Sequence, residues 1–97
     1  MDALKAVPEE TTLIMENERV RVFGVKFKPG QKTLMHSHPD HVVYVLKDGK
    51  LKITLPDGTS NEVSLKAGQA IWMNAQQHSV ENLGKTEASN LVIELKK

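Results

Sequence analysis

Residues 30–49 have the sequence GQKTLMHSHPDHVVYVLKDG, which carries the clearest structural signals of the chain. It contains two short β-strand patterns, at 33–38 and 41–46, separated by a proline and an aspartate. The second pattern is rich in valine and closes on Asp48-Gly49, a pair that strongly favours a hairpin turn. We therefore expect short strands joined by tight turns, with three histidines in or beside the two strands at 33–38 and 41–46.

The same strand character continues on both sides of this stretch. Similar patterns occupy residues 19–28, 51–55, 62–65, 70–73, 78–80 and 89–95. In 19–28 the alternation slips at Phe23-Gly24, where a β-bulge is expected. Eight or nine short strands at regular spacing predict an all-β sandwich or barrel. We expect residues 1–17 to form an N-terminal arm or edge strand, and residues 18–97 to form the barrel domain.

The composition excludes several classes of function. The 97 residues include no cysteine, so neither a disulfide nor a thiolate metal site can form. A net charge of +1 and only four aromatic residues argue against a nucleic-acid partner. The chain has no apolar run long enough to span a membrane and no secretory leader, which predicts a cytoplasmic protein without a membrane partner.

The histidines are the candidate metal ligands. His36 and His38 are two residues apart, so on a strand they point to the same face and can reach one ion at about 2.0–2.1 Å. His78 lies on another expected strand, and distant strands can be neighbours in a barrel. Alternation along the chain places His41 on the face opposite His38, but the intervening Pro39-Asp40 can turn it inward. Whether His41 is a fourth ligand stays open.

Two motifs resemble those of the cupin superfamily. In the first motif Gly30, His36, His38 and Gly49 are in register, and Val42 stands where the family usually has a glutamate. In the second motif Gly68, His78 and Asn82 fit the pattern, whereas Asn74 and Gln76 replace its usual proline and glycine. The resemblance covers roughly residues 18–95. The narrower likeness is to small single-domain cupins, including those linked to β-alanine degradation.

This resemblance implies a double-stranded β-helix, also called a cupin or jelly-roll barrel, with a divalent metal ion in its mouth. The ligands carried over from the family are His36, His38 and His78, and the ion is Fe, Ni, Mn or Zn. Small cupins usually form homodimers, which implies pairing through sheet edges and the N-terminal strand.

The absence of a glutamate ligand shapes the expected function. Three neutral imidazoles leave a divalent ion near +2, which favours a small anionic substrate in the open coordination position. The expected function is an enzyme with dioxygenase-like, isomerase or lyase chemistry, and the alternative is a non-catalytic module that binds or senses a small ligand or a metal. Catalytic residues are not assigned. Tyr44 is expected to share the face of Val42, where it either lines the cavity or is a buried core residue with its hydroxyl hydrogen-bonded.

Overall fold

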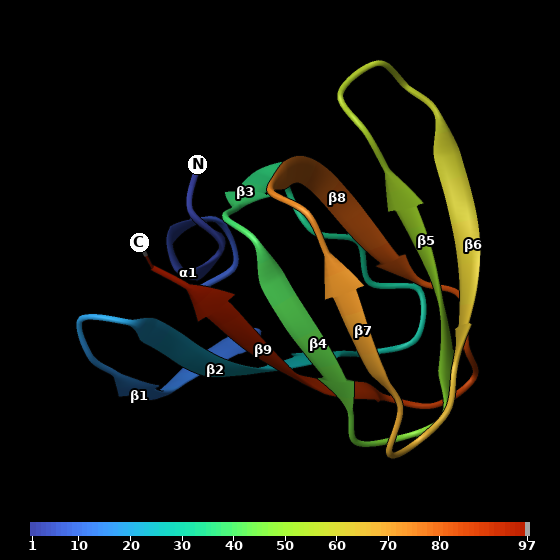
Figure 1. The fold of residues 1–97 in the computed structure, drawn as a ribbon. Helices are drawn as coiled ribbons and strands as arrows, with labels where there is room; N and C mark the ends of the chain where they lie inside the picture. Colours follow the sequence, from blue (N-terminus) through green and yellow to red (C-terminus); the bar gives the residue numbers. More distant parts are fainter. Residues whose placement is uncertain (97) are drawn as a thin grey trace.

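The computed structural model describes residues 1–96, and nearly all of its regular structure is β-strand (Figure 1). The elements in chain order are α1 (Ala3–Ala6), β1 (Thr11–Glu16), β2 (Val20–Phe27), β3 (His36–His38), β4 (His41–Val45), β5 (Gly49–Thr54), β6 (Ser60–Leu65), β7 (Ala70–Met73), β8 (Gln76–Asn82) and β9 (Ala88–Leu95). The expected all-β class is confirmed. No helix among residues 1–96 is long and apolar enough to cross a membrane.

The strands form two sheets that enclose one core. The five-stranded sheet has the order β1-β2-β9-β4-β7, the four-stranded sheet has the order β3-β8-β5-β6, and neighbouring strands in both are antiparallel. Consecutive strands such as β3 and β4 lie in different sheets, as in the jelly-roll double-stranded β-helix that the resemblance implies. Apolar side chains from both sheets meet between them, among them Phe23, Val45, Leu51, Val80 and Val92.

The N-terminal segment packs beside this barrel. The backbone oxygen of Met1 accepts from the amide of Ser37 on β3, and β1 forms one edge of the five-stranded sheet. Both α1 and β1 fall within residues 1–17. The domain boundary expected after residue 17 stays a prediction.

The prediction of a β-bulge at Phe23-Gly24 is wrong. Strand β2 pairs with β9 without interruption, and the irregularity lies instead in β1, between Leu13 and Met15. The slip in the sequence pattern arises because β2 breaks the usual division between an apolar inner face and a polar outer face. Arg21 points inward, where it pairs with a buried carboxylate, while Val22 points outward.

Candidate metal centre

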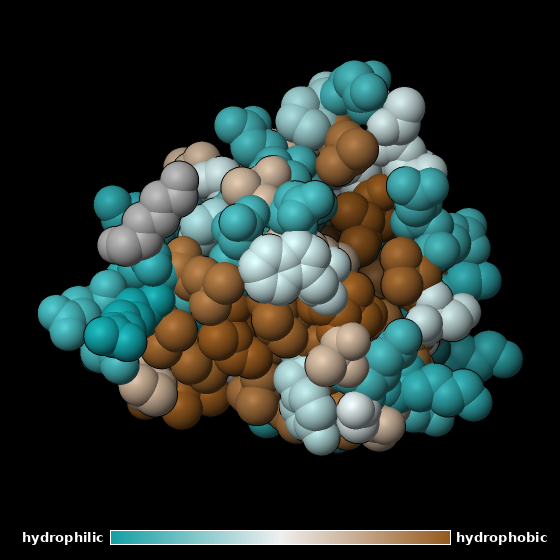
Figure 2. All heavy atoms as spheres, viewed as in Figure 1, coloured by the Kyte–Doolittle hydropathy of each residue, from teal (hydrophilic) through white to brown (hydrophobic). Residues whose placement is uncertain are grey.

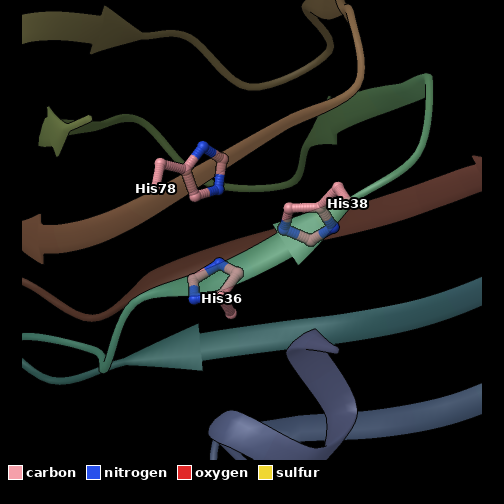
Figure 3. Close-up of side chains that lie close together, drawn as sticks. All are labelled: His36, His38 and His78. Atoms are coloured by element: carbon pink, nitrogen blue, oxygen red, sulfur yellow. The ribbon is translucent and has the colours of Figure 1, made fainter. Parts of the chain in front are cut away.

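The pairing of β3 with β8 brings three histidines together at one end of the barrel interior (Figure 3). His36 lies directly opposite His78, and His38 follows two residues later on the same face of β3. One ring nitrogen from each residue lies within 4.8 Å of those from the other two, and all three side chains are buried. The predicted ligand residues therefore form one compact cluster.

Each of these rings is held by a hydrogen bond at Nδ1. The partner of His36 is the backbone oxygen of Leu34 at 2.8 Å, that of His78 is Oε1 of Gln76 at 2.9 Å, and that of His38 is a carboxylate oxygen of Glu94 at 2.6 Å. These oxygens are acceptors, so each Nδ1 carries the proton and donates it. The lone pair on Nε2 is then free in each ring, which is the arrangement of metal-ligating histidines in proteins.

His41 lies beside the cluster and is not part of it. It points into the barrel with 1% of its surface exposed, and its ring stacks on that of His38 with 4.4 Å between centroids. Its Nδ1 donates to the backbone oxygen of Pro39 at 2.8 Å. Alternation along the chain did not predict this inward position, because β3 and β4 belong to different sheets and the chain changes direction at Pro39-Asp40.

Two of the next residues of β4, Val42 and Tyr44, face away from the cavity. Val42, at the position compared with the family's glutamate, pairs with Trp72 and Ile93 on the outer face of the sheet. Tyr44 shares that outer face and is 40% exposed, so both expectations for it, a cavity-lining or a buried core residue, are wrong. His41 is therefore the residue of β4 that faces the cluster.

His38 is hydrogen-bonded to the first of a series of paired charged groups. The Glu94 carboxylate, which accepts from His38, also accepts from Nε of Arg21 at 2.9 Å and from Nη2 of Arg21 at 2.5 Å. The third nitrogen of Arg21, Nη1, donates to the carboxylate of Asp2 at 2.8 Å. Glu94 is 2% exposed, so its charge is balanced by Arg21 inside the protein rather than by water.

The protonation states follow from these contacts. Burial alone raises the pKa of the Glu94 carboxyl, but hydrogen bonds from His38 and Arg21 outweigh it and hold that pKa below its usual value. Burial lowers the pKa of His36 and His41, and burial together with the neighbouring histidines lowers the pKa of His78 to about 3. His36 and His78, two of the proposed ligands, and the neighbouring His41 are thus neutral at pH 7, and the neutral state is the one that an imidazole needs to bind a metal.

The histidines open onto an apolar cavity of about 70 Å³. Apart from the four histidines, its lining comes from uncharged side chains of both sheets, including Phe23, Val43, Ile71 and Met73. No carboxylate or ammonium group among residues 1–96 lines it. Any charged group of a bound molecule must therefore be balanced at the histidine end.

Sequence reasoning missed Glu94 and Arg21. The sequence did contain a signal for Glu94. Alternation along the strand at 88–95 places it on the same inward-facing side as Ala88, Asn90 and Val92. A carboxylate on the buried face of a strand needs a partner. The identity of that partner depends on the pairing of β2 with β9, which sequence reasoning did not establish.

Comparison with known proteins identifies the family. The Cupin domain family matches residues 23–94, most of the chain. The chain belongs to the cupin family. A cupin domain from Bordetella pertussis is 34% identical and has a TM-score of 0.82, over 90% of this chain and 92% of that one. No protein of curated function matches.

More distant cupin structures share the fold. A cupin superfamily protein from Desulfitobacterium hafniense is 18% identical with a TM-score of 0.67, over 90% of this chain and 76% of that one. An RmlC-like cupin with a double-stranded β-helix fold, from Methanocaldococcus jannaschii, is 16% identical with a TM-score of 0.67, over 89% of this chain and 80% of that one. Cupins often bind metal, and the three buried histidines of this cupin could hold an ion.

The lowered pKa of His78 predicts how the metal-free protein responds to acid. Above pH 6.5 this imidazole is neutral in both the folded and the unfolded chain. Between pH 6.5 and about 3 only the unfolded chain takes up the proton, so the free energy of unfolding falls as pH falls, by up to about 1.4 kcal/mol per pH unit. Urea unfolding of the metal-free protein between pH 7 and pH 5 measures this slope. The variant His78→Gln should show a shallower dependence of unfolding free energy on pH. Equal slopes in the variant and the wild type would contradict the lowered pKa of His78.

The buried carboxylate predicts a second effect on stability. Glu94→Ala removes the acceptor of both His38 and Arg21, leaving a partly buried guanidinium with Asp2 alone. We expect it to lower the free energy of unfolding by about 3 kcal/mol or more. Glu62→Ala is the matched control, because Glu62 is exposed and pairs with Lys50 on the surface, so it should cost less than about 1 kcal/mol. Similar losses in the two variants would contradict the role given to Glu94.

Proposed function

We propose that this cupin binds one divalent metal ion through the Nε2 atoms of His36, His38 and His78 and acts as an enzyme on a small molecule bound to that ion. The observation that supports the proposal is the Nδ1 pattern. All three rings donate from Nδ1 to an oxygen, which leaves three Nε2 lone pairs in one compact cluster.

The donor set fits Fe, Ni, Mn or Zn, because its three members are neutral imidazoles, which bind first-row divalent ions. Three protein ligands leave a coordination position open, as in catalytic rather than structural sites. An ion held there would supply Lewis-acid chemistry on a coordinated substrate atom and, if redox-active, chemistry with dioxygen.

The cavity points to the class of substrate. The nearest carboxylate, Glu94, is already paired with Arg21 and does not offset the charge of a bound ion. An anionic group of the substrate, such as a carboxylate, enolate or thiolate, would offset it. The rest of the substrate would meet apolar side chains, and a cavity of about 70 Å³ admits only a small molecule.

His41 is the residue in this proposal that moves a proton. It lines the same cavity, its Nδ1 is occupied by Pro39, and burial lowers the pKa of its ring so that Nε2 can accept a proton at neutral pH. Dioxygenase-like, isomerase and lyase reactions on a small anion all fit this arrangement.

A non-catalytic module that binds a small ligand or a metal is the second candidate. It is favoured by the cavity lining, which among residues 1–96 includes no titratable side chain except the histidines. The two candidates share the metal site and differ in turnover.

Metal analysis tests the site that both candidates need. Untagged protein incubated with Fe(II), Mn(II), Ni(II) or Zn(II) and then desalted should retain about one equivalent of at least one ion. The double variant His36→Ala/His38→Ala should retain less than about a tenth of that, because one imidazole cannot hold the ion alone. Ser37→Ala is the matched control, since Ser37 lies between the two ligands but points away from them. Equal metal content in wild type and double variant would refute the site.

Turnover tests the role of His41. With metal restored, wild-type protein is offered a panel of small carboxylates and thiols, and oxygen uptake and product formation are followed. His41→Gln should keep its metal and lose about 10²-fold or more in rate, as expected when a general base is removed. Loss of metal in this variant would make His41 a ligand instead. Absence of turnover across the panel by metal-loaded wild type would favour the non-catalytic module.

A further inference from the structure

One polar side chain inside the barrel lacks a partner. Asn90 lies on the inward side of β9, is 4% exposed and lines the same cavity as the histidines. Of the buried side-chain oxygen and nitrogen atoms in residues 1–96, its Oδ1 is the only one without a hydrogen bond. An amide oxygen that leaves water without gaining a hydrogen bond destabilises the fold, so the chain alone gives this amide no structural role.

The surroundings of Asn90 explain why the chain does not satisfy its amide. The neighbours of Asn90 on β2 and β4 are Val25 and Val45, and both are buried apolar side chains. The backbone of the sheet separates the amide from the opposite side, where apolar side chains form a broad surface over β2, β9 and β4 (Figure 2). A partner for the amide oxygen must therefore come from the cavity.

A second buried asparagine, Asn82, shows what a structural role requires. Its Nδ2 donates to the backbone oxygens of Phe27 and Thr86, at 3.0 Å each, and its Oδ1 accepts from the amide of Gly84 at 2.8 Å. These bonds hold the turn that follows β8. Asn82 thus uses both ends of its amide within the chain, whereas Asn90 leaves its oxygen unused.

The cavity lining makes a water molecule a poor partner for this amide. A buried water is typically held by about three hydrogen bonds to polar groups. Apart from Asn90 and the histidines, the only polar side chain of residues 1–96 in the lining is Thr11, whose hydroxyl already donates to the backbone oxygen of Val7. A ligand that has one polar group at Asn90 and apolar atoms beside it fits this lining better.

Asn90 and the histidine cluster lie at different levels of the cavity. Glu94, which accepts from His38, is on the same side of β9 as Asn90, and the rise of a strand separates the two by about 13 Å. A cavity of about 70 Å³ that is lined by residues of both levels is narrow. It fits an unbranched chain better than a ring or a branched molecule.

We propose that the amide of Asn90 binds the far end of the substrate through a hydrogen bond to a neutral hydroxyl or carboxamide group. The inference rests on the proposed function, in which the near end of the substrate is an anionic group on the metal ion. An ammonium group does not fit at Asn90, because no carboxylate of residues 1–96 lines the cavity to balance its charge. The substrate class is then an unbranched acid or thiol with a terminal hydroxyl or carboxamide.

Urea unfolding of the metal-free protein tests whether Asn90 serves the fold. Asn90→Leu removes an amide with an unbonded oxygen and nearly keeps its volume, so the unfolding midpoint should stay the same or rise. Asn82→Leu is the matched control, because it breaks the hydrogen bonds of a satisfied amide and should lower the midpoint by about 1 M or more. A similar loss in both variants, or an Asn90→Leu chain that fails to fold, would overturn the inference.

Titration with matched acids, followed by NMR, tests binding at Asn90. The probes are the ω-hydroxy derivatives of propionate, butyrate, valerate and caproate, each paired with the acid in which a methyl group replaces the hydroxyl. At the best-fitting length, zinc-loaded wild type should bind the hydroxy acid about 10-fold more tightly than its methyl counterpart. Asn90→Leu should keep its zinc and lose or invert this preference. Equal affinities in wild type at every length, or an unchanged preference in the variant, would overturn the role of Asn90.

The ratio of the two affinities separates this inference from the proposed metal site. Loss of the ion, as in His36→Ala/His38→Ala, weakens both acids of a pair, because both bind the ion through the same carboxylate. It leaves the advantage of the hydroxyl at Asn90 in place. A chain that holds no zinc but keeps the ratio would refute the proposed function and support the role of Asn90. A zinc-loaded chain without the ratio would refute the role of Asn90 and leave the metal site standing.

Discussion

The buried carboxylate of Glu94 is the constraint from which the site follows. An ionised carboxylate removed from water costs several kcal/mol unless it is paired and hydrogen-bonded, so its neighbours have little freedom. Arg21 lies on the adjacent strand, directly opposite Glu94. The ion pair between them therefore forms only when β2 and β9 are paired in this register. His38 comes from the other sheet, and its hydrogen bond to Glu94 joins the two sheets at the histidine end of the barrel. The same bond sets the proton on Nδ1 and turns Nε2 toward the other two ligands. One carboxylate thus specifies strand register, sheet closure, ring orientation and tautomer.

The five-stranded sheet is unusual in being apolar on both faces. Its inner face contributes to the core, and its outer face exposes aromatic and aliphatic side chains of β4 and β7. The row that contains Arg21, Glu94 and His41 on the inside alternates with the row of Val22, Ile93 and Val42 on the outside. The wall of the site and the exposed outer face of the sheet are therefore two sides of the same backbone segments.

The strands and the shared face of His36 and His38 could be predicted from sequence because their information is local, whereas His78, 40 residues further on, entered the candidate ligand set only through the resemblance to cupins. Short alternating runs, turn pairs and the His36-Ser-His38 spacing each act within a few residues. The sequence does not predict which side chains of β4 point into the barrel, because alternation does not continue across Pro39-Asp40, where the chain passes from one sheet to the other. For that reason the sequence does not determine the direction of His41 and predicts the wrong side for Tyr44. The bulge expected at Phe23-Gly24 failed for a related reason, since the usual rule of apolar inside and polar outside does not hold where Arg21 faces in and Val22 faces out. Partners that depend on long-range pairing, such as Arg21 with Glu94, require the topology.

All three proposed ligands belong to β3 and β8, which are neighbours in one sheet. An ion bound to them would sit on a single wall of the barrel and would not bridge the two sheets; the link between the sheets at that end is made by protein groups alone. Loading and removal of an ion would then leave the barrel closed and intact, so that one folded scaffold could exchange one metal for another.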